Sequence, residues 1–177
     1  MVRTNKYFPI NLSCFRQLIL CLSVAFSVSI YAEDMPSFEQ FKVSDISLTT
    51  LKEVDFDSHT DGVYVEQSWH GMMASVIGQP ANFAGKFTIF GTGCGTGCQH
   101  NLVVNVETGK IIDTVTSGLG LCHQADSSLL IVNPRLNDFG DETPDWAFTY
   151  YYQFDGNEFR LLHKVRSGYA GKCVFGQ

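Results

Sequence analysis

From residue 87 to residue 165 the sequence repeats one pattern, in which short runs of β-branched and aromatic residues are separated by glycine, aspartate and asparagine. Runs of this length and composition are typical of β-strands, and the polar, glycine-containing gaps are typical of turns. The pattern predicts strands at Phe87–Phe90, Leu102–Val106, Ile111–Val115, Ser128–Val132, Ala147–Phe154 and Phe159–Val165. Short strands joined by tight turns pair in the antiparallel sense.

Two of the gaps also specify their turn chemistry. Glu107-Thr108-Gly109-Lys110 joins two branched aliphatic runs, and Asp155-Gly156-Asn157 joins two aromatic ones. In each, the glycine can take the positive φ that a tight hairpin requires. We therefore expect a β-hairpin at each of these positions.

The strand that ends at Phe154 contains an aromatic row. Alternation along a strand places Tyr150, Tyr152 and Phe154 on one face and Tyr151 on the other, so both faces are expected to be covered. Exposed rows of this kind bind sugar rings, but a strand packed under a helix is the favoured interpretation. The row is therefore assigned to the core.

A different periodicity precedes the strands and predicts a helix over residues 61–77. Apolar residues recur there at the spacing of one helical stripe, at Val65, Trp69, Met72, Met73 and Val76. Asp61 can cap its start, and Gly78 followed by Pro80 ends it. The predicted fold class is α+β, with one antiparallel β-sheet of about five to seven strands and this helix packed on it. A further strand is expected within residues 41–51.

Residues 1–32 have the layout of a secretory signal peptide. Arg3, Lys6 and Arg16 precede the apolar stretch 18–30, which is closed by Ala32. That stretch is shorter than the roughly 20 residues that a membrane-spanning helix needs. We expect cleavage after Ala32, a single β-rich domain over 33–177 whose first residues, 33–40, are loose, and no membrane anchor afterwards. The expected compartment is the periplasm or the cell exterior.

The charge balance restricts the partners. The chain carries 12 lysines and arginines against 18 aspartates and glutamates, which gives a formal net charge of −6 at pH 7. Nucleic-acid binding depends on clustered basic residues that neutralise phosphates, and the sequence has no such cluster. Nucleic acid and anionic membrane surfaces are thus excluded as expected partners, whereas an envelope or extracellular protein is a candidate.

The segment 91–100 alternates glycine with other residues and contains Cys94 and Cys98. Its glycine spacing does not match the dinucleotide-binding fingerprint, and it lacks the lysine of a phosphate loop, so no nucleotide cofactor is predicted. Three residues between the cysteines allow a disulfide across a tight turn. Cys122 and Cys173 would then form a second one, although four cysteines permit three connectivities. The stapled loop is the candidate binding site, with Gly95, Thr96, Gly97, Gln99 and His100.

Other uses of these cysteines stay open at this point. The four cysteines, alone or with His100 or His123, supply enough ligands for zinc, Cys94 and Cys98 can form a redox pair, and Cys98 can act as a nucleophile beside His100. Exported thiols are usually oxidised, and nothing adjacent lowers a thiol pKa. We therefore predict no metal, no cofactor and no catalytic residue.

Two motifs carry a resemblance to a known family. Asn82-Phe83-Ala84-Gly85-Lys86-Phe87-Thr88-Ile89 leads into Gly93-Cys94-Gly95-Thr96-Gly97-Cys98. Together they resemble a family of small exported bacterial proteins that has no assigned activity. The resemblance implies bacterial export and one compact domain, and it brings no catalytic residues.

These features favour an exported, non-enzymatic binding or inhibitor-type protein whose ligand is unknown. Two alternatives are kept beside it. One is a structural or accessory envelope domain without a ligand of its own, and the other is an envelope enzyme, either a hydrolase or a thiol oxidoreductase.

Overall fold

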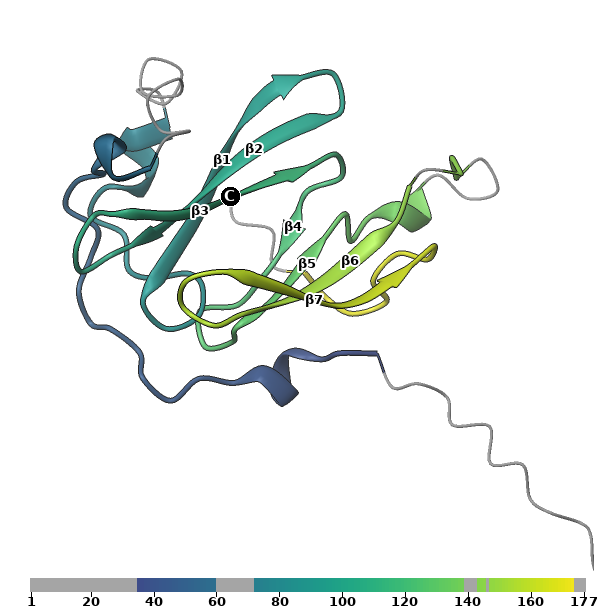
Figure 1. Ribbon diagram of the computed structural model, residues 1–177, viewed down its shortest axis with the longest axis horizontal. Helices are drawn as coiled ribbons and strands as arrows, with labels where there is room; N and C mark the ends of the chain where they lie inside the picture. Colours follow the sequence, from purple (N-terminus) through teal and green to yellow (C-terminus); the bar gives the residue numbers. More distant parts are fainter. Residues whose placement is uncertain (1–34, 60–71, 139–142, 146, 174–177) are drawn as a thin grey trace, which may run out of the picture. The chain divides into compact units, whose positions relative to one another are not determined.

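The computed structural model describes residues 35–59, 72–138, 143–145 and 147–173, so the expected signal peptide lies outside the described residues. Within them, seven strands form two antiparallel sheets (Figure 1). Sheet 1 has the order β1-β2-β3, and sheet 2 has the order β4-β5-β6-β7. In chain order the strands are β1 Phe87–Gly95, β2 Cys98–Asn105, β3 Ile111–Ser117, β4 Leu121–Cys122, β5 Leu129–Val132, β6 Thr149–Phe154 and β7 Phe159–Val165.

The two sheets pack against each other through an apolar layer. Side chains from β1 and β2 meet side chains from β5 and β6 around Phe83, which is fully buried. The buried members of this layer are Phe83, Phe87, Ile89, Val103, Leu130, Val132 and Phe154. Removing this much apolar surface from water is the main favourable term in joining the sheets.

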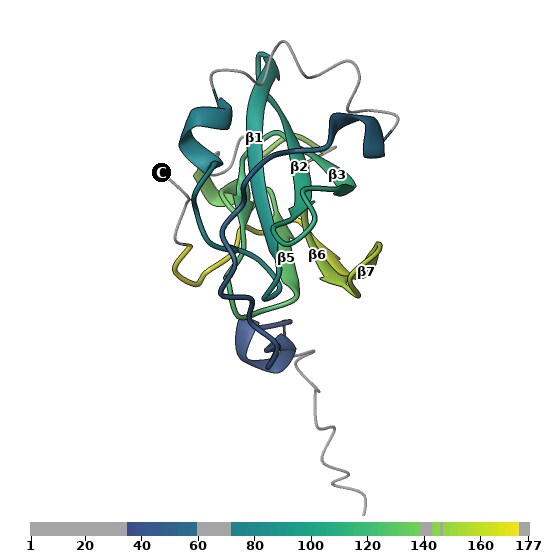
Figure 2. The same cartoon turned by 90° about the vertical axis from the view of Figure 1, so that its left-hand side faces the viewer.

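The outer faces of both sheets are covered as well. On sheet 1, a helix at residues 72–76 contributes Met72, Met73 and Val76 to a cluster built around Leu102 and Val104 (Figure 2). On sheet 2, the covering groups come from both ends of the described chain, and the cluster contains Phe38, Cys122, Leu129, Ile131, Tyr151, Tyr169 and Cys173. Strands covered on both faces read as continuous apolar runs, as β5 and residues 102–104 of β2 do.

The antiparallel β-rich character is confirmed, and the hairpins at Gly109 and Gly156 form with positive φ at both glycines. The prediction of a single sheet fits only roughly, because the chain leaves sheet 1 after β3 and begins sheet 2 with β4. The side chain of Asn133 fixes this crossing, since its Oδ1 accepts the N–H groups of Gly118 (2.9 Å) and Leu119 (3.0 Å). Side-chain alternation is the same in one sheet as in two, so the pattern could not show the crossing.

The expected helix and the expected strand at residues 41–51 both differ from the structure. The described part of the expected helix, residues 72–76, covers sheet 1 and does not cover the aromatic strand β6, while residues 60–71 lie outside the described chain. Residues 41–51 form no strand and make two isolated bridges, Lys42 with Ser127 and Thr50 with Pro80.

The leader that was expected to be loose contains a 3-10 helix, η1, at Phe38–Phe41. A capping box between Ser37 and Gln40 starts it, and Phe38 is only 5% exposed because it packs under sheet 2. A second 3-10 helix, η2, at Phe56–Ser58 lies beside β3. No helix within the described residues is long and apolar enough to span a membrane.

Candidate functional site

Both expected cysteine pairs lie at disulfide distance. The Cα atoms of Cys94 and Cys98 are 5.1 Å apart at the end of the β1–β2 hairpin, and those of Cys122 and Cys173 are 5.3 Å apart. The second pair ties β4 to the C-terminal segment. Disulfides persist in oxidising compartments, so the two pairs are consistent with an exported environment. A thiolate ligand or nucleophile requires a free cysteine, which paired cysteines do not supply.

The residues of the candidate binding loop divide into two groups. Gly95, Thr96 and Gly97 form the exposed tip of the hairpin, where both glycines have positive φ. Gln99 and His100 belong to β2, and the Gln99 side chain accepts a hydrogen bond of 3.2 Å from the hydroxyl of Ser117. The tip is thus an exposed turn closed by a disulfide, while Gln99 helps to attach the hairpin to the end of β3. The binding role of this loop stays a prediction.

The motif that begins at Asn82 has a structural task. The Asn82 side chain forms two hydrogen bonds with the backbone of Ile89, donating to its carbonyl at 3.0 Å and accepting its N–H at 2.8 Å. Phe83 fills the centre of the core, and Gly85 turns the chain with a φ of +79°. A Cβ on Gly85 would overlap the carbonyl oxygen of Asp45. The motif therefore builds the start of β1.

His123 is also structural. Its Nδ1 lies 2.9 Å from the carbonyl oxygen of Asn82, and its ring meets Phe83 edge-on at 6.0 Å. Burial lowers the pKa of His123 below its ordinary value, and the bond to the Asn82 carbonyl offsets part of that effect. The neutral ring of His123 therefore packs at the edge of the core.

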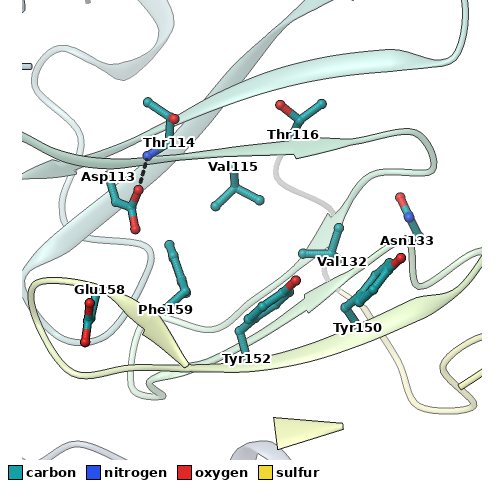
Figure 3. Close-up of a pocket in the computed structure, with 10 residues that line it drawn as sticks. All are labelled: Asp113, Thr114, Val115, Thr116, Val132, Asn133, Tyr150, Tyr152, Glu158 and Phe159. Atoms are coloured by element: carbon teal, nitrogen blue, oxygen red, sulfur yellow. Dashed lines mark hydrogen bonds between the residues drawn. The ribbon is translucent and has the colours of Figure 1, made fainter. Parts of the chain in front are cut away.

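A groove with a volume of about 360 Å³ opens between the two sheets. This volume falls at the small end of the roughly 300–1,000 Å³ that is usual for ligand pockets. One side of the groove is β3, and the other is formed by β5, β6 and the start of β7 (Figure 3). The ten lining residues are Asp113, Thr114, Val115, Thr116, Val132, Asn133, Tyr150, Tyr152, Glu158 and Phe159.

The groove has an aromatic floor. Tyr150 and Tyr152 lie on the same face of β6 with ring centroids 6.1 Å apart and planes only 20° apart. Phe159 meets Tyr152 edge-on at 6.1 Å. Both tyrosine hydroxyls point from β6 toward the side of the groove that β3 forms (Figure 3). Burial, and to a smaller extent the charge of Tyr150, raises the pKa of Tyr152, so its hydroxyl is a neutral donor at ordinary pH.

The rim of the groove is polar, and both charged side chains that line it are acidic. Asp113 and Glu158 place two carboxylates near the β6–β7 turn, and one oxygen of Asp113 accepts the N–H of Thr114 at 2.7 Å. Toward the other end, the Lys164 ammonium lies 3.8 Å from the ring centroid of Phe148 and 5.3 Å from that of Tyr150. The charge that a ligand meets within the groove is therefore negative, while Lys164 lies outside the groove lining.

No family model, curated protein or solved structure matches this chain. The family resemblance of the Asn82 and Cys94 motifs accordingly stays a prediction. Function has to be argued from the geometry of the groove and of the stapled hairpin.

Sequence reasoning identified the cysteines and the aromatic row but missed the groove. Alternation correctly placed Tyr150, Tyr152 and Phe154 on one face of the strand, but that face meets the other sheet and not the expected helix. The sequence signal for the groove is the segment 113–116, in which Asp113, Thr114 and Thr116 are polar and only Val115 is apolar. Only the fold brings that strand over the tyrosines.

Proposed function

We propose that this protein is an exported, non-enzymatic binding protein, of the periplasm or the cell exterior, that holds its ligand in the groove between β3 and β6–β7. One observation carries the proposal. Three half-buried aromatic rings, those of Tyr150, Tyr152 and Phe159, line an open groove whose rim is polar. Apolar walls with a few polar groups are the usual construction of ligand sites.

The composition of the groove favours binding over catalysis. Its ten lining residues include no serine, cysteine, histidine or lysine. The serine and cysteine nucleophiles and the histidine base that are most common in hydrolases are therefore not among the groups that line it. The remaining titratable groups are two carboxylates and two tyrosines, and the Asp113 carboxylate is already engaged by the N–H of Thr114. These groups suit hydrogen bonding and charge recognition.

The test is a protein-observed NMR screen of the isotope-labelled, disulfide-intact protein against a chemically diverse library of saccharides, short peptides and amines. We expect hits that shift the amide signals of residues 113–116 and 150–152. Tyr152→Ala should weaken them at least tenfold, because it removes a ring from the floor. Leu48→Ala is the matched control, since Leu48 is 97% exposed and does not line the groove.

Two results would count against the groove as the binding site. One is a set of hits that bind Tyr152→Ala as well as the unaltered protein. The other is a screen without hits, which would favour the structural or accessory alternative. An enzyme would reveal itself by chemical change of a hit during the measurement.

The stapled hairpin supports a second candidate function, the docking of its tip into a cleft of a partner protein such as an envelope hydrolase. The tip is exposed, slim and closed by the Cys94–Cys98 pair. A rigid loop loses little conformational entropy on binding. Thr96→Arg places a bulky charge at the tip, so it should abolish inhibition of such a hydrolase while leaving ligand binding in the groove intact.

A further inference from the structure

The groove runs along the backbone edge of β3. Four consecutive residues, 113–116, line it. Successive side chains of a strand point to opposite faces, and Figure 3 shows Val115 pointing toward the tyrosines while Thr114 and Thr116 point away from them. A groove that touches all four in a row must follow the edge of the strand, where the peptide groups lie.

That edge is open for pairing. β3 is the last strand of sheet 1 and pairs only with β2 within the described chain. The N–H of Thr114 bonds to the Asp113 carboxylate and so points away from β2, and alternation gives the peptide groups of Thr116 the same direction. The beginning of the edge is closed, because the Ser58 hydroxyl accepts the N–H of Ile111 at 2.8 Å. The open part therefore extends along the second half of β3.

Sheet 2 has four strands and sheet 1 has three, which leaves part of the inner face of sheet 2 uncovered. Tyr152 pairs with Leu161 across β6 and β7, so these two side chains share a face, and Leu161 is 50% exposed. Strands in a sheet are about 4.8 Å apart and packed sheets about 10 Å apart. A strand added beside β3 would therefore lie over Tyr152, Phe159 and Leu161.

We infer that the groove takes an extended peptide segment of a partner protein, which adds to β3 as a fourth strand of sheet 1. This inference rests on the proposed function and specifies its ligand class. Main-chain hydrogen bonds to Thr116 and to the carbonyl of Thr114 supply affinity, and side chains at alternate positions supply specificity. The aromatic floor selects apolar side chains at every second position.

Charge complementarity defines the peptide further. Asp113 and Glu158 lie near the β6–β7 turn, and the whole chain has a formal net charge of −6. A lysine or arginine in the peptide pairs with these carboxylates and fixes its direction along β3. A second copy of this acidic chain brings acidic groups to the same end, so a basic partner fits the groove better.

The experiment selects peptides from a displayed library of random twelve-residue sequences on the disulfide-intact protein. We expect the enriched peptides to alternate apolar with other residues and to carry a basic residue. Thr116→Pro should weaken them at least tenfold, because proline removes an N–H that points away from β2 and leaves the β2–β3 hydrogen bonds in place. Leu48→Ala should change their affinity by less than about twofold.

A second measurement keeps the inference testable if the Thr116→Pro variant does not fold. The best peptide is made in two forms, each methylated on every second backbone nitrogen, in opposite registers. Only one register of peptide N–H groups faces β3, so one form should lose binding at least tenfold and the other should retain it. Equal loss or equal retention in both registers would overturn strand addition.

The remaining outcomes separate this inference from the proposed function. Hits from the NMR screen that lose affinity with Tyr152→Ala and not with Thr116→Pro would leave the groove a ligand site and refute strand addition. A library that yields no groove-binding peptide would refute it as well. A dimer of the free protein that Thr116→Pro abolishes would mean that a second copy occupies the edge, against a partner peptide.

Discussion

The two cysteine pairs should contribute very differently to stability. Cys122 and Cys173 are 51 positions apart, and Cys94 and Cys98 are 4 apart. Loop-closure entropy assigns about 4 kcal/mol at 25 °C to a cross-link over the longer span and about 2 kcal/mol to one over the shorter span. Cys122→Ala with Cys173→Ala should therefore lower the free energy of unfolding about twice as much as Cys94→Ala with Cys98→Ala.

Packing increases the difference. Cys122 is 1% exposed and belongs to the cluster of Phe38 and Tyr151 on the outer face of sheet 2, so replacing its sulfur also leaves a small void. Cys94 is exposed at the end of a hairpin. A domain of this kind has a total stability of about 5–15 kcal/mol, so losing the longer cross-link brings the protein close to its unfolding threshold.

The assay is equilibrium unfolding in urea, followed by circular dichroism, for the unaltered protein and the two double variants without reductant. Mass spectrometry confirms the remaining disulfide in each variant. A loss for the hairpin variant equal to or larger than that of the Cys122 and Cys173 variant would refute this reasoning. It would mean that the staple supports the core through the β3–β4 connection instead of fixing only the tip.

Three further substitutions test other parts of the structure by the same unfolding assay. Gly85→Ala should cost at least about 2 kcal/mol, because alanine is strained at a φ of +79° and its Cβ overlaps Asp45; a loss below about 0.5 kcal/mol would contradict this. Phe83→Ala should cost about 3–5 kcal/mol through the cavity it leaves between the sheets, and a smaller loss would show that the layer repacks. The pKa of His123 in the folded protein lies below its ordinary 6.5. As the pH falls below 6.5, the unfolded state binds a proton that the folded state does not bind. The contribution of His123 to the free energy of unfolding is therefore complete above pH 6.5 and is lost as the pH falls toward the folded pKa. His123→Gln should flatten the decline in stability between about pH 7 and 5, and an unchanged slope would assign that decline to other groups.

Local chemistry made the strands and hairpins predictable. A glycine that permits positive φ, placed between two β-type runs, specifies a hairpin without reference to the rest of the chain, and the turns at Gly109 and Gly156 show this. The facial assignment of Tyr151 against Tyr150 and Tyr152 followed from strand geometry alone. Spacing likewise permitted both cysteine pairs, although it could not select them among three connectivities.

The number of sheets and the groove depended on non-local choices. The turn after β3 is an ordinary glycine-containing loop in the sequence. In the structure, the Oδ1 of Asn133, distant in the chain, accepts its Gly118 and Leu119 N–H groups and helps to direct it from one sheet to the other. Val115 and Tyr152 meet for the same reason. Sequence analysis also did not assign any strand to an edge, because the pairing partners decide which strand remains there.

The two edge strands that flank the groove are protected to different degrees. β7 carries Arg160 and Lys164 along its length, and charged side chains are a common means of keeping an edge from pairing with another chain. β3 has Asp113, whose carboxylate closes one N–H, followed by the strong strand formers Thr114, Val115 and Thr116. One outward N–H of β3 is therefore occupied and the next one is free to pair. Such an edge limits unspecific aggregation and still allows one strand to pair in one register. In the strand addition that we infer, the added peptide also covers the aromatic floor beside β3.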